Sequence, residues 1–232
     1  MTVADFAVRF LIAIIIGYLL GSIPFGVLIG RRMAKVDVRN YGSGKMGTTN
    51  VLRVAGKKAA ALVALLDVSK GAVAVIIAGL IVGNNYMVVS VFGLGRLAAE
   101  VFAALAAMVG HTWPIFLKFH GGRGVATFFG GLIALCPAAA FFGGEIGLLG
   151  ASLTRFASLG SIAGAVGTYT ILVPLTIING FPIEYILYAL FGTIAILATH
   201  RDNISRLLAG KERRLGEKAE KANPSPTKTD LG

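Results

Sequence analysis

Two long apolar runs constrain this chain more than any other feature. One extends from Phe10 to Ile29 without a charge, and the other from Ala59 to Val82. Each is about as long as the roughly 20 apolar residues that a helix needs to cross a bilayer. Because lipid offers no hydrogen-bond partners to the backbone, such runs fold as helices. The sequence therefore predicts an all-α integral membrane protein.

The composition supports a membrane protein over a soluble one. Of the 232 residues, 56% are hydrophobic and 14% are charged, whereas a soluble domain is about a quarter charged. The first run is too long for a signal peptide and has no small-residue cleavage motif after it, so we expect it to be retained. The single cysteine, Cys136, lies in an apolar run, where we expect it to pack as a small side chain.

The positive charges lie at the ends of the apolar runs. Of the 22 Lys and Arg residues, eight lie between Arg31 and Lys58 and eight between Arg201 and Lys228. Positive flanks mark the cytoplasmic side of a membrane, so the net charge of +11 does not indicate nucleic-acid binding. We expect a transmembrane domain over 1–212 and a disordered, charged cytoplasmic tail over 213–232.

Counting the runs predicts seven spans, with the N-terminus outside and the C-terminus inside. The count depends on the segment from Val125 to Leu153, which has Pro137 near its middle. Two short helices there would return Arg155 to the cytoplasmic side, and each would be half-length or sheltered by its neighbours. The alternative is one long pass, which gives six spans and places Arg155 outside.

The first of three polar clusters, Tyr41 to Arg53, combines glycines with hydroxyls, an amide and two cations. Free backbone N–H groups beside such side chains are suited to an anionic phosphate. The cluster is not a Walker A loop, because position 39 is Arg39 and Met46 follows the lysine. The alternative is a flexible interfacial loop whose cations reach towards water. The expected phosphate-binding residues are Gly42, Ser43, Gly44, Lys45, Thr48, Thr49, Asn50 and Arg53.

The other two clusters lie at Gly110–Gly124 and His200–Glu212. In the first of these, Gly121, Gly122 and Arg123 lead into a helix, whose N-terminus would form a second anion site. In the other, His200 and Asn203 are three residues apart and would share a face if the last helix continues through them. For His111 the sequence favours neither a packing role nor a catalytic role.

Ionisable residues also lie within the apolar runs, where they are costly unless paired. Asp67 and Lys70 are spaced to pair and point into the bundle, and Arg96 and Glu100 are spaced to pair along a helix. Glu145 has no nearby opposite charge in the sequence. No group of residues has the spacing of zinc ligands, so we expect no metal.

These clusters resemble the membrane acyl-phosphate:glycerol-3-phosphate acyltransferases of bacteria, the PlsY family. The resemblance runs through Gly42-Ser43-Gly44, Thr49-Asn50, Gly124-Val125-Ala126-Thr127 and His200-Arg201 with Asn203, and covers the chain up to Glu212. It implies seven membrane helices and transfer of an acyl group from acyl phosphate to the 1-hydroxyl of glycerol 3-phosphate. The products would be lysophosphatidic acid and phosphate.

The resemblance also implies roles for individual residues. His200, Asn203 and Ser43 would be catalytic, and Arg53 and Arg123 would bind substrate together with Ser158 or Ser161. The sequence departs from the family at Lys45, where the family commonly has Asn, and at Arg123, where it commonly has Lys. The change from Lys to Arg at position 123 replaces a compact ammonium group by a planar guanidinium group.

The resemblance places the enzyme in the bacterial inner membrane with its active site facing the cytoplasm. Its partners would be the two substrates and the bilayer, with no cofactor, no nucleic acid and no inferred protein partner. The H-x-x-x-x-D motif of other acyltransferases is absent, which supports an acyl-phosphate donor. The alternative function is a transporter of phosphate or phosphate esters built on half-length helices.

Overall fold

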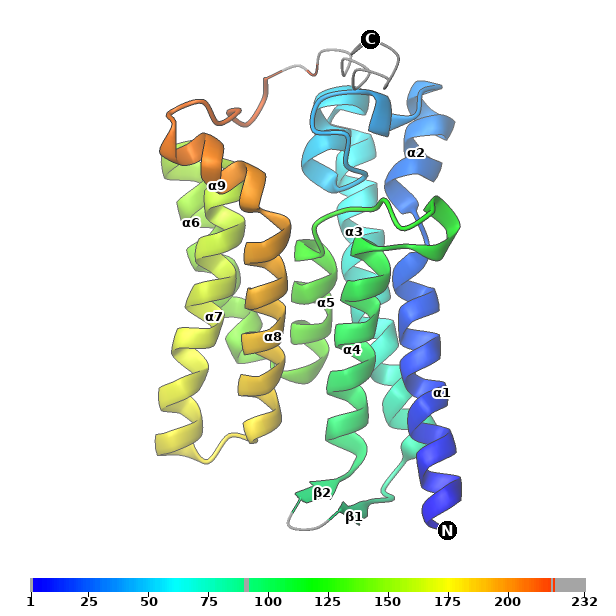
Figure 1. Ribbon diagram of the computed structural model, residues 1–232. Helices are drawn as coiled ribbons and strands as arrows, with labels where there is room; N and C mark the ends of the chain where they lie inside the picture. The colour runs from blue at the N-terminus through cyan, green and yellow to red at the C-terminus, as the bar shows by residue number, and fades with distance from the viewer. Residues whose placement is uncertain (1, 90–91, 218, 220–232) are drawn as a thin grey trace, which may run out of the picture.

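The computed structural model describes residues 2–89, 92–217 and 219, and it is a bundle of helices (Figure 1). The helices of the described residues are α1 (Val3–Ser22), α2 (Phe25–Ala34), α3 (Thr48–Val82), α4 (Arg96–Thr112), α5 (Val125–Leu135), α6 (Pro137–Thr154), α7 (Ala157–Asn179), α8 (Ile183–Thr199) and α9 (Arg201–Leu208). Two short 3-10 helices, η1 (Val38–Asn40) and η2 (Ile115–Leu117), lie in the connecting loops. The all-helical membrane architecture predicted from the sequence is confirmed.

Proline sets two of the breaks between helices. The first apolar run was expected to be one span, but it divides at Ile23 and Pro24 into α1 and α2. Proline lacks an N–H group and forces the preceding residue into an extended conformation, which ends α1. The predicted division of Val125–Leu153 is confirmed, because α5 ends before Cys136 and α6 begins at Pro137.

The polar N-terminal cluster is more helical than expected. Helix α3 begins at Thr48 rather than near Ala59, and it is kinked at Gly56, where φ is +83°. Only glycine adopts this backbone conformation readily. Thr49, Asn50 and Arg53 therefore lie on the first turns of a helix, and their side chains are fixed by it.

A small hairpin replaces the expected start of the third span. Strands β1 (Met87–Val89) and β2 (Phe92–Leu94) pair antiparallel, with Val88 opposite Gly93. The span then begins at Arg96, and the predicted pair forms, with 2.7 Å between Arg96 Nε and Glu100 Oε1. The apolar sequence between 86 and 95 does not distinguish a strand from a helix end.

Four helical stretches among the described residues are long and apolar enough to cross a membrane, and five if the bent pair α8 and α9 counts as one. Helix α5 is apolar but short, with 11 residues. The expectation of two half-length helices is consistent with α5 but is wrong for α6, which has 18 residues. The count of seven spans stays a prediction.

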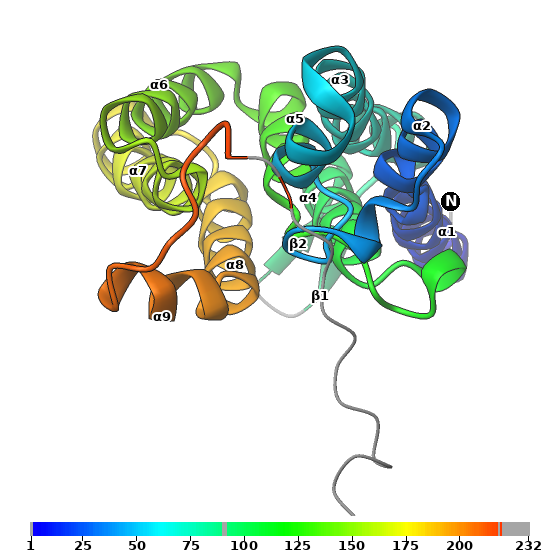
Figure 2. The ribbon, with the colours of Figure 1, turned by 90° about the horizontal axis from the view of Figure 1, so that it is seen from above.

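The helices form two groups that meet at α4 and α5. Viewed from above, α1 to α3 lie on one side of this central pair and α6 to α9 on the other (Figure 2). The main apolar core joins the groups, with Phe128 of α5 stacked on Tyr188 of α8 and Leu132 and Leu172 buried nearby. Tyr188 donates a 2.8 Å hydrogen bond to Phe128 O, which satisfies its buried hydroxyl. Cys136 is buried in the same core, as predicted.

Candidate active site

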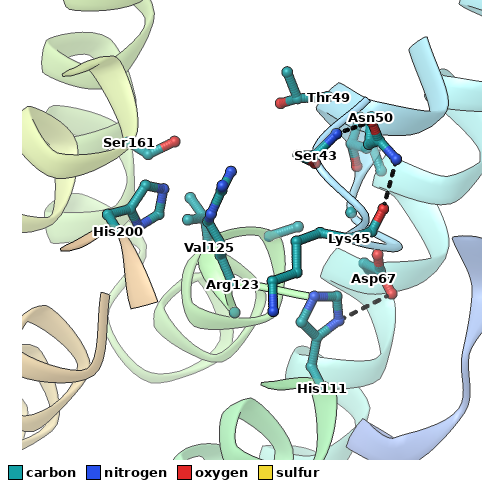
Figure 3. Close-up of a pocket in the computed structure, with 15 residues that line it drawn as sticks. Ser43, Lys45, Thr49, Asn50, Asp67, His111, Arg123, Val125, Ser161 and His200 are labelled. Carbon is teal, nitrogen blue, oxygen red and sulfur yellow. Dashed lines mark hydrogen bonds and ion pairs between the residues drawn. The ribbon is translucent and has the colours of Figure 1, made fainter. Parts of the chain in front are cut away.

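The three polar clusters meet at one end of the bundle, opposite the N-terminus and the hairpin (Figure 1). There they enclose a cavity of about 260 Å³ between α3, α5 and the α8–α9 junction. Lys45, Arg123 and His200 point towards it from three separate segments (Figure 3). Segments that are far apart in the sequence therefore supply one site.

Asn50 organises the loop that precedes α3. Its side-chain oxygen accepts a hydrogen bond from Ser43 N at 3.1 Å. Its amide nitrogen donates to the carbonyl oxygens of Val38 at 2.8 Å, Tyr41 at 3.1 Å and Lys45 at 2.8 Å. The amide was expected to bind substrate, and the residue lines the cavity. Its hydrogen bonds within the loop also position Ser43 and Lys45.

Two helix N-termini face the cavity. Gly47 caps α3 and Gly124 caps α5, and neither helix has a side-chain cap. The first residues of both helices, Thr48 and Val125, line the cavity. Uncapped N–H groups carry the positive end of the helix dipole, so both termini attract an anion.

Two cations add to this positive field. Lys45 and Arg123 both line the cavity, and neither forms an ion pair in the described part of the chain. Burial lowers the pKa of Arg123 to about 10, and burial together with the charge of Arg123 lowers the pKa of Lys45. With a pKa of about 10, Arg123 stays protonated at pH 7, so the cavity carries charge that an anionic ligand would neutralise.

His200 is a neutral side chain at the edge of the cavity. Burial, and to a smaller extent the charge of Arg123, lower its pKa to about 4. Its Nδ1 lies 2.8 Å from Ile196 O. Because a carbonyl oxygen only accepts, Nδ1 carries the proton and Nε2 keeps a free lone pair. His200 can therefore accept a hydrogen bond or a proton at Nε2.

A smaller hollow adjoins the cavity and shares Thr49, Arg123, Ser161 and His200 with it. Glu212 fills part of this hollow, where its carboxylate accepts from Ser158 Oγ at 3.0 Å and from Asn203 Nδ2 at 2.6 Å. Arg53 Nη2 lies 3.3 Å from the carbonyl oxygens of Arg213 and Arg214. The segment after α9 thus packs across the predicted substrate residues.

The sequence as a whole matches one family model. Residues 11–210 match the model described as glycerol-3-phosphate acyltransferase, which is most of the chain. The chain belongs to the glycerol-3-phosphate acyltransferase family.

Individual relatives within the glycerol-3-phosphate acyltransferase family agree with this assignment. The chain is 60% identical over 211 residues to glycerol-3-phosphate acyltransferase 3 of Dehalococcoides mccartyi strain CBDB1, which covers 91% of this chain and 98% of the relative. It is 42% identical over 207 residues to the glycerol-3-phosphate acyltransferase of Thermus thermophilus, covering 89% and 96%.

Solved structures of the family have the same fold. The crystal structure of PlsY, an integral membrane glycerol 3-phosphate acyltransferase, in its glycerol 3-phosphate form superposes with a TM-score of 0.76 at 36% identity. That match covers 89% of this chain and 96% of PlsY. The lysophosphatidic acid form gives a TM-score of 0.74 at 35% identity, covering 89% and 95%.

The predicted site residues of this acyltransferase divide into two sets. One set lines the cavity or the hollow and consists of Ser43, Lys45, Thr49, Asn50, Arg53, Arg123, Ser158, Ser161, His200 and Asn203. The glycines form the other set, and none of the four lines either space. Gly42 and Gly44 adopt φ of +58° and +67°, which shapes the loop. Gly121 and Gly122 donate their N–H groups to Thr112 O and His111 O at 3.1 and 3.0 Å.

Thr48 was expected among the phosphate-binding residues of a loop, but it lines the cavity as the first residue of α3. The sequence reasoning missed two other features of the site. Glu212 was named only as the end of a cluster, and it lies 54 residues from Ser158 in the chain. The last helix breaks at His200 with a bend of 63°, yet His200 and Asn203 both stay buried beside the hollow. The bend turns α9 across the end of the bundle, where Asn203 meets Glu212.

Proposed function

We propose that this chain transfers an acyl group from acyl phosphate to the 1-hydroxyl of glycerol 3-phosphate. The products are lysophosphatidic acid and inorganic phosphate. The observation that carries the proposal is a single cavity bounded by two uncapped helix N-termini, Lys45, Arg123 and the neutral His200. Both substrates carry a phosphate group, and this cavity has the charge and the N–H groups to bind one.

The residues divide between binding and reaction. Arg53, Lys45 and Arg123 supply the positive charge for phosphate, with Thr49, Ser158 and Ser161 as neutral hydrogen-bond partners, and the backbone of Gly42, Gly44, Gly121 and Gly122 shapes the loops. His200, Asn203 and Ser43 contact the reacting groups. Asn50 holds the loop that carries Ser43 and Lys45.

The reaction needs no covalent enzyme intermediate, because acyl phosphate is already an activated mixed anhydride. The substrate hydroxyl oxygen forms a bond to the acyl carbon, and the bond from that carbon to the phosphate oxygen breaks. The hydroxyl proton passes to a phosphate oxygen of the donor or to His200 Nε2. Cations and helix N-termini stabilise the charge on the departing phosphate, and the cavity aligns the two substrates.

The proposal includes a membrane topology. Seven spans, an outside N-terminus and an inside C-terminus would place the site at the cytoplasmic face of a bacterial inner membrane. Support comes from the charge distribution, because Arg31, Lys58 and Arg201 flank the same end of the bundle as the site. Among the described residues, no three His, Cys, Asp or Glu side chains gather as metal ligands. The proposed reaction uses no metal or cofactor, because acyl phosphate already carries an activated acyl group.

The test is an assay of detergent-purified protein with both substrates. We expect phosphate release from acyl phosphate only when glycerol 3-phosphate is added, with equal formation of lysophosphatidic acid, and no loss of rate with a chelator. Phosphate release without glycerol 3-phosphate would contradict the proposal. Uptake of glycerol 3-phosphate into proteoliposomes without acyl transfer would favour a transporter instead.

A further inference from the structure

A buried charged cluster contributes Asp67 and His111 to the lining of the cavity, and the proposed chemistry does not use it. Lys70 Nζ lies 2.8 Å from Asp67 Oδ1 on α3, as the sequence predicted. His111 Nδ1, on α4, lies 3.5 Å from the same carboxylate oxygen. All three side chains are at most 3% exposed. Burying charges is costly, and apolar residues of similar size would pack as well or better. The cluster therefore needs a reason other than stability.

Lys70 connects the cluster to the break between the first two helices. Its Nζ donates a 3.1 Å hydrogen bond to Ile23 O, which has no helical partner because Pro24 ends α1. The ammonium also lies 5.6 Å from the centre of the Phe25 ring. The Lys70 ammonium is thus satisfied by the Ile23 carbonyl at the helix break and by the Asp67 carboxylate. These contacts do not explain why Asp67 also lies against His111.

His111 connects the cluster to the glycine turn that carries Arg123. Its carbonyl oxygen accepts from Gly122 N at 3.0 Å, and Thr112 O accepts from Gly121 N at 3.1 Å. Gly122 has no room for a Cβ, which would fall on Nε2 of the His111 ring. The ring therefore lies directly against the residue before Arg123, with Asp67 on its other side (Figure 3).

A contact from the end of α8 also holds the backbone of Arg123. Thr199 Oγ1 donates to Arg123 O at 3.2 Å from the end of α8. The guanidinium has no hydrogen bond to another side chain in the described part of the chain, and its Nε is buried without a partner. The direction of the guanidinium thus depends on the backbone turn. That turn is held by the carbonyl oxygens of His111 and Thr112 and packs against the His111 ring.

We infer that His111, oriented by Asp67, is a positioning residue that sets the direction of Arg123 into the cavity. His111 Nδ1 has no hydrogen-bond partner at closer range in the described residues, so Asp67 is the group that determines the orientation of the ring. This inference rests on the proposed function, because it assigns Arg123 to a substrate phosphate. It adds a residue that acts through Arg123.

The experiment compares His111→Leu with His111→Asn in the acyl-transfer assay. Leucine fills the space but cannot donate to Asp67, whereas the asparagine amide nitrogen falls near the place of Nδ1. Misplacing a binding group by about 1 Å can cost roughly 100-fold in rate. We expect His111→Leu to lower kcat/KM by about that factor and His111→Asn to retain most of the activity. Equal activity of the two variants would overturn the inference.

A double-mutant cycle separates positioning from packing. If His111 acts through Arg123, His111→Leu should cost little more in an Arg123→Gln background, because the group it positions is already gone. A packing role predicts the same loss in both backgrounds, and that result would overturn the inference. A wild-type enzyme without acyl transfer would instead overturn the proposed function, so the two failures are distinguishable.

If His111→Leu folds poorly, a second variant tests the same inference. Replacing Asp67 by Asn and Lys70 by Met together removes the ion pair without leaving one buried charge. The ring of His111 then loses the carboxylate that orients it. We expect this double substitution to lower kcat/KM and to show the same coupling to Arg123→Gln. Additive losses would again contradict the positioning role.

Discussion

Asn203 Nδ2 donates a 2.6 Å hydrogen bond to Oε1 of Glu212, nine residues later in the chain. The same oxygen accepts from Ser158 Oγ at 3.0 Å, and Arg206 Nε lies 2.8 Å from the other oxygen. The Glu212 side chain is 5% exposed. One carboxylate thus joins α7, α9 and the segment that follows α9.

Replacing Glu212 by Gln should loosen this junction. The amide loses its charge and one acceptor, and a hydrogen bond to a charged group contributes about 1.5 to 3 kcal/mol. We expect a lower thermal midpoint and weaker binding of glycerol 3-phosphate, because Arg206 loses its acceptor and the neutral amide oxygen binds Ser158 and Asn203 less strongly. The control is Glu217→Gln, an exposed residue of the same segment. Equal midpoints for the two variants would show that the junction is not stabilising.

Asn50→Asp should disrupt the loop before α3 although the two side chains have the same shape. The carboxylate would face the carbonyl oxygens of Val38, Tyr41 and Lys45, which now accept from the amide. Unsatisfied or repelled buried groups cost about 1 to 3 kcal/mol each. We expect loss of activity and faster proteolysis of the loop. Asn40→Asp, on an exposed position of the same loop, should behave as wild type.

Arg53→Lys should be damaging although it conserves the charge. If Arg53 binds a substrate phosphate through two parallel hydrogen bonds, lysine cannot make the same bidentate contact. Losing one charge-assisted hydrogen bond costs about 1.5 to 3 kcal/mol, or roughly 10- to 150-fold in kcat/KM. The matched control is Arg201→Lys, whose side chain is 85% exposed. The two variants are compared by their kcat/KM for glycerol 3-phosphate at saturating acyl phosphate. A near-normal value for Arg53→Lys would indicate that Lys45 and Arg123, rather than Arg53, bind the phosphate.

The pKa of His200 predicts how stability changes with pH. The folded value of about 4 lies below the value of about 6.5 in an unfolded chain. Between these values the unfolded chain binds more protons, so this contribution to stability is present above about pH 6.5 and is lost as the pH falls towards 4. The difference in thermal midpoint between wild type and His200→Gln should therefore change as the pH falls from 7 to 5, to the disadvantage of wild type. His120→Gln, on an exposed loop, should keep the wild-type pH dependence.

The proposed topology predicts which introduced cysteines an impermeant reagent labels in intact cells. Arg32 and Asn84 are both exposed and lie at opposite ends of the bundle, and the natural Cys136 is buried. A cysteine at Asn84 should be labelled directly, and one at Arg32 only after lysis. Labelling of the Arg32 position without lysis would reverse the orientation.

Several local features were predictable because they depend on neighbouring residues. The division at Pro137 follows from the missing N–H group of proline, and the Asp67–Lys70 and Arg96–Glu100 pairs follow from helical spacing. The break at Pro24 carries the same signal, but the surrounding apolar run was interpreted as one helix. The start of α3 at Thr48 was also missed, since polar residues at a helix N-terminus resemble a loop.

Contacts between distant segments could not be predicted. The glycines at 121 and 122 were expected to bind substrate, and the structure gives their N–H groups to α4 because the turn folds back on it. Part of the expected tail is described and packs on the bundle, where Leu215 N donates to Arg155 O at 2.7 Å. The rest of that expected disordered tail lies outside the described residues.

The sequence by itself determined the membrane helices, the polar clusters and the chemistry of their side chains, because hydrophobic run length, proline and helical spacing act over a few residues. Only the tertiary structure decided which polar groups face the cavity and which bind one another. Asn50 and Glu212 show why: each has hydrogen-bonding groups suited to a substrate, but protein partners 5 to 54 residues away use them. Such pairings depend on how α3, α7 and α9 pack, and helix packing places residues from across the chain around one site.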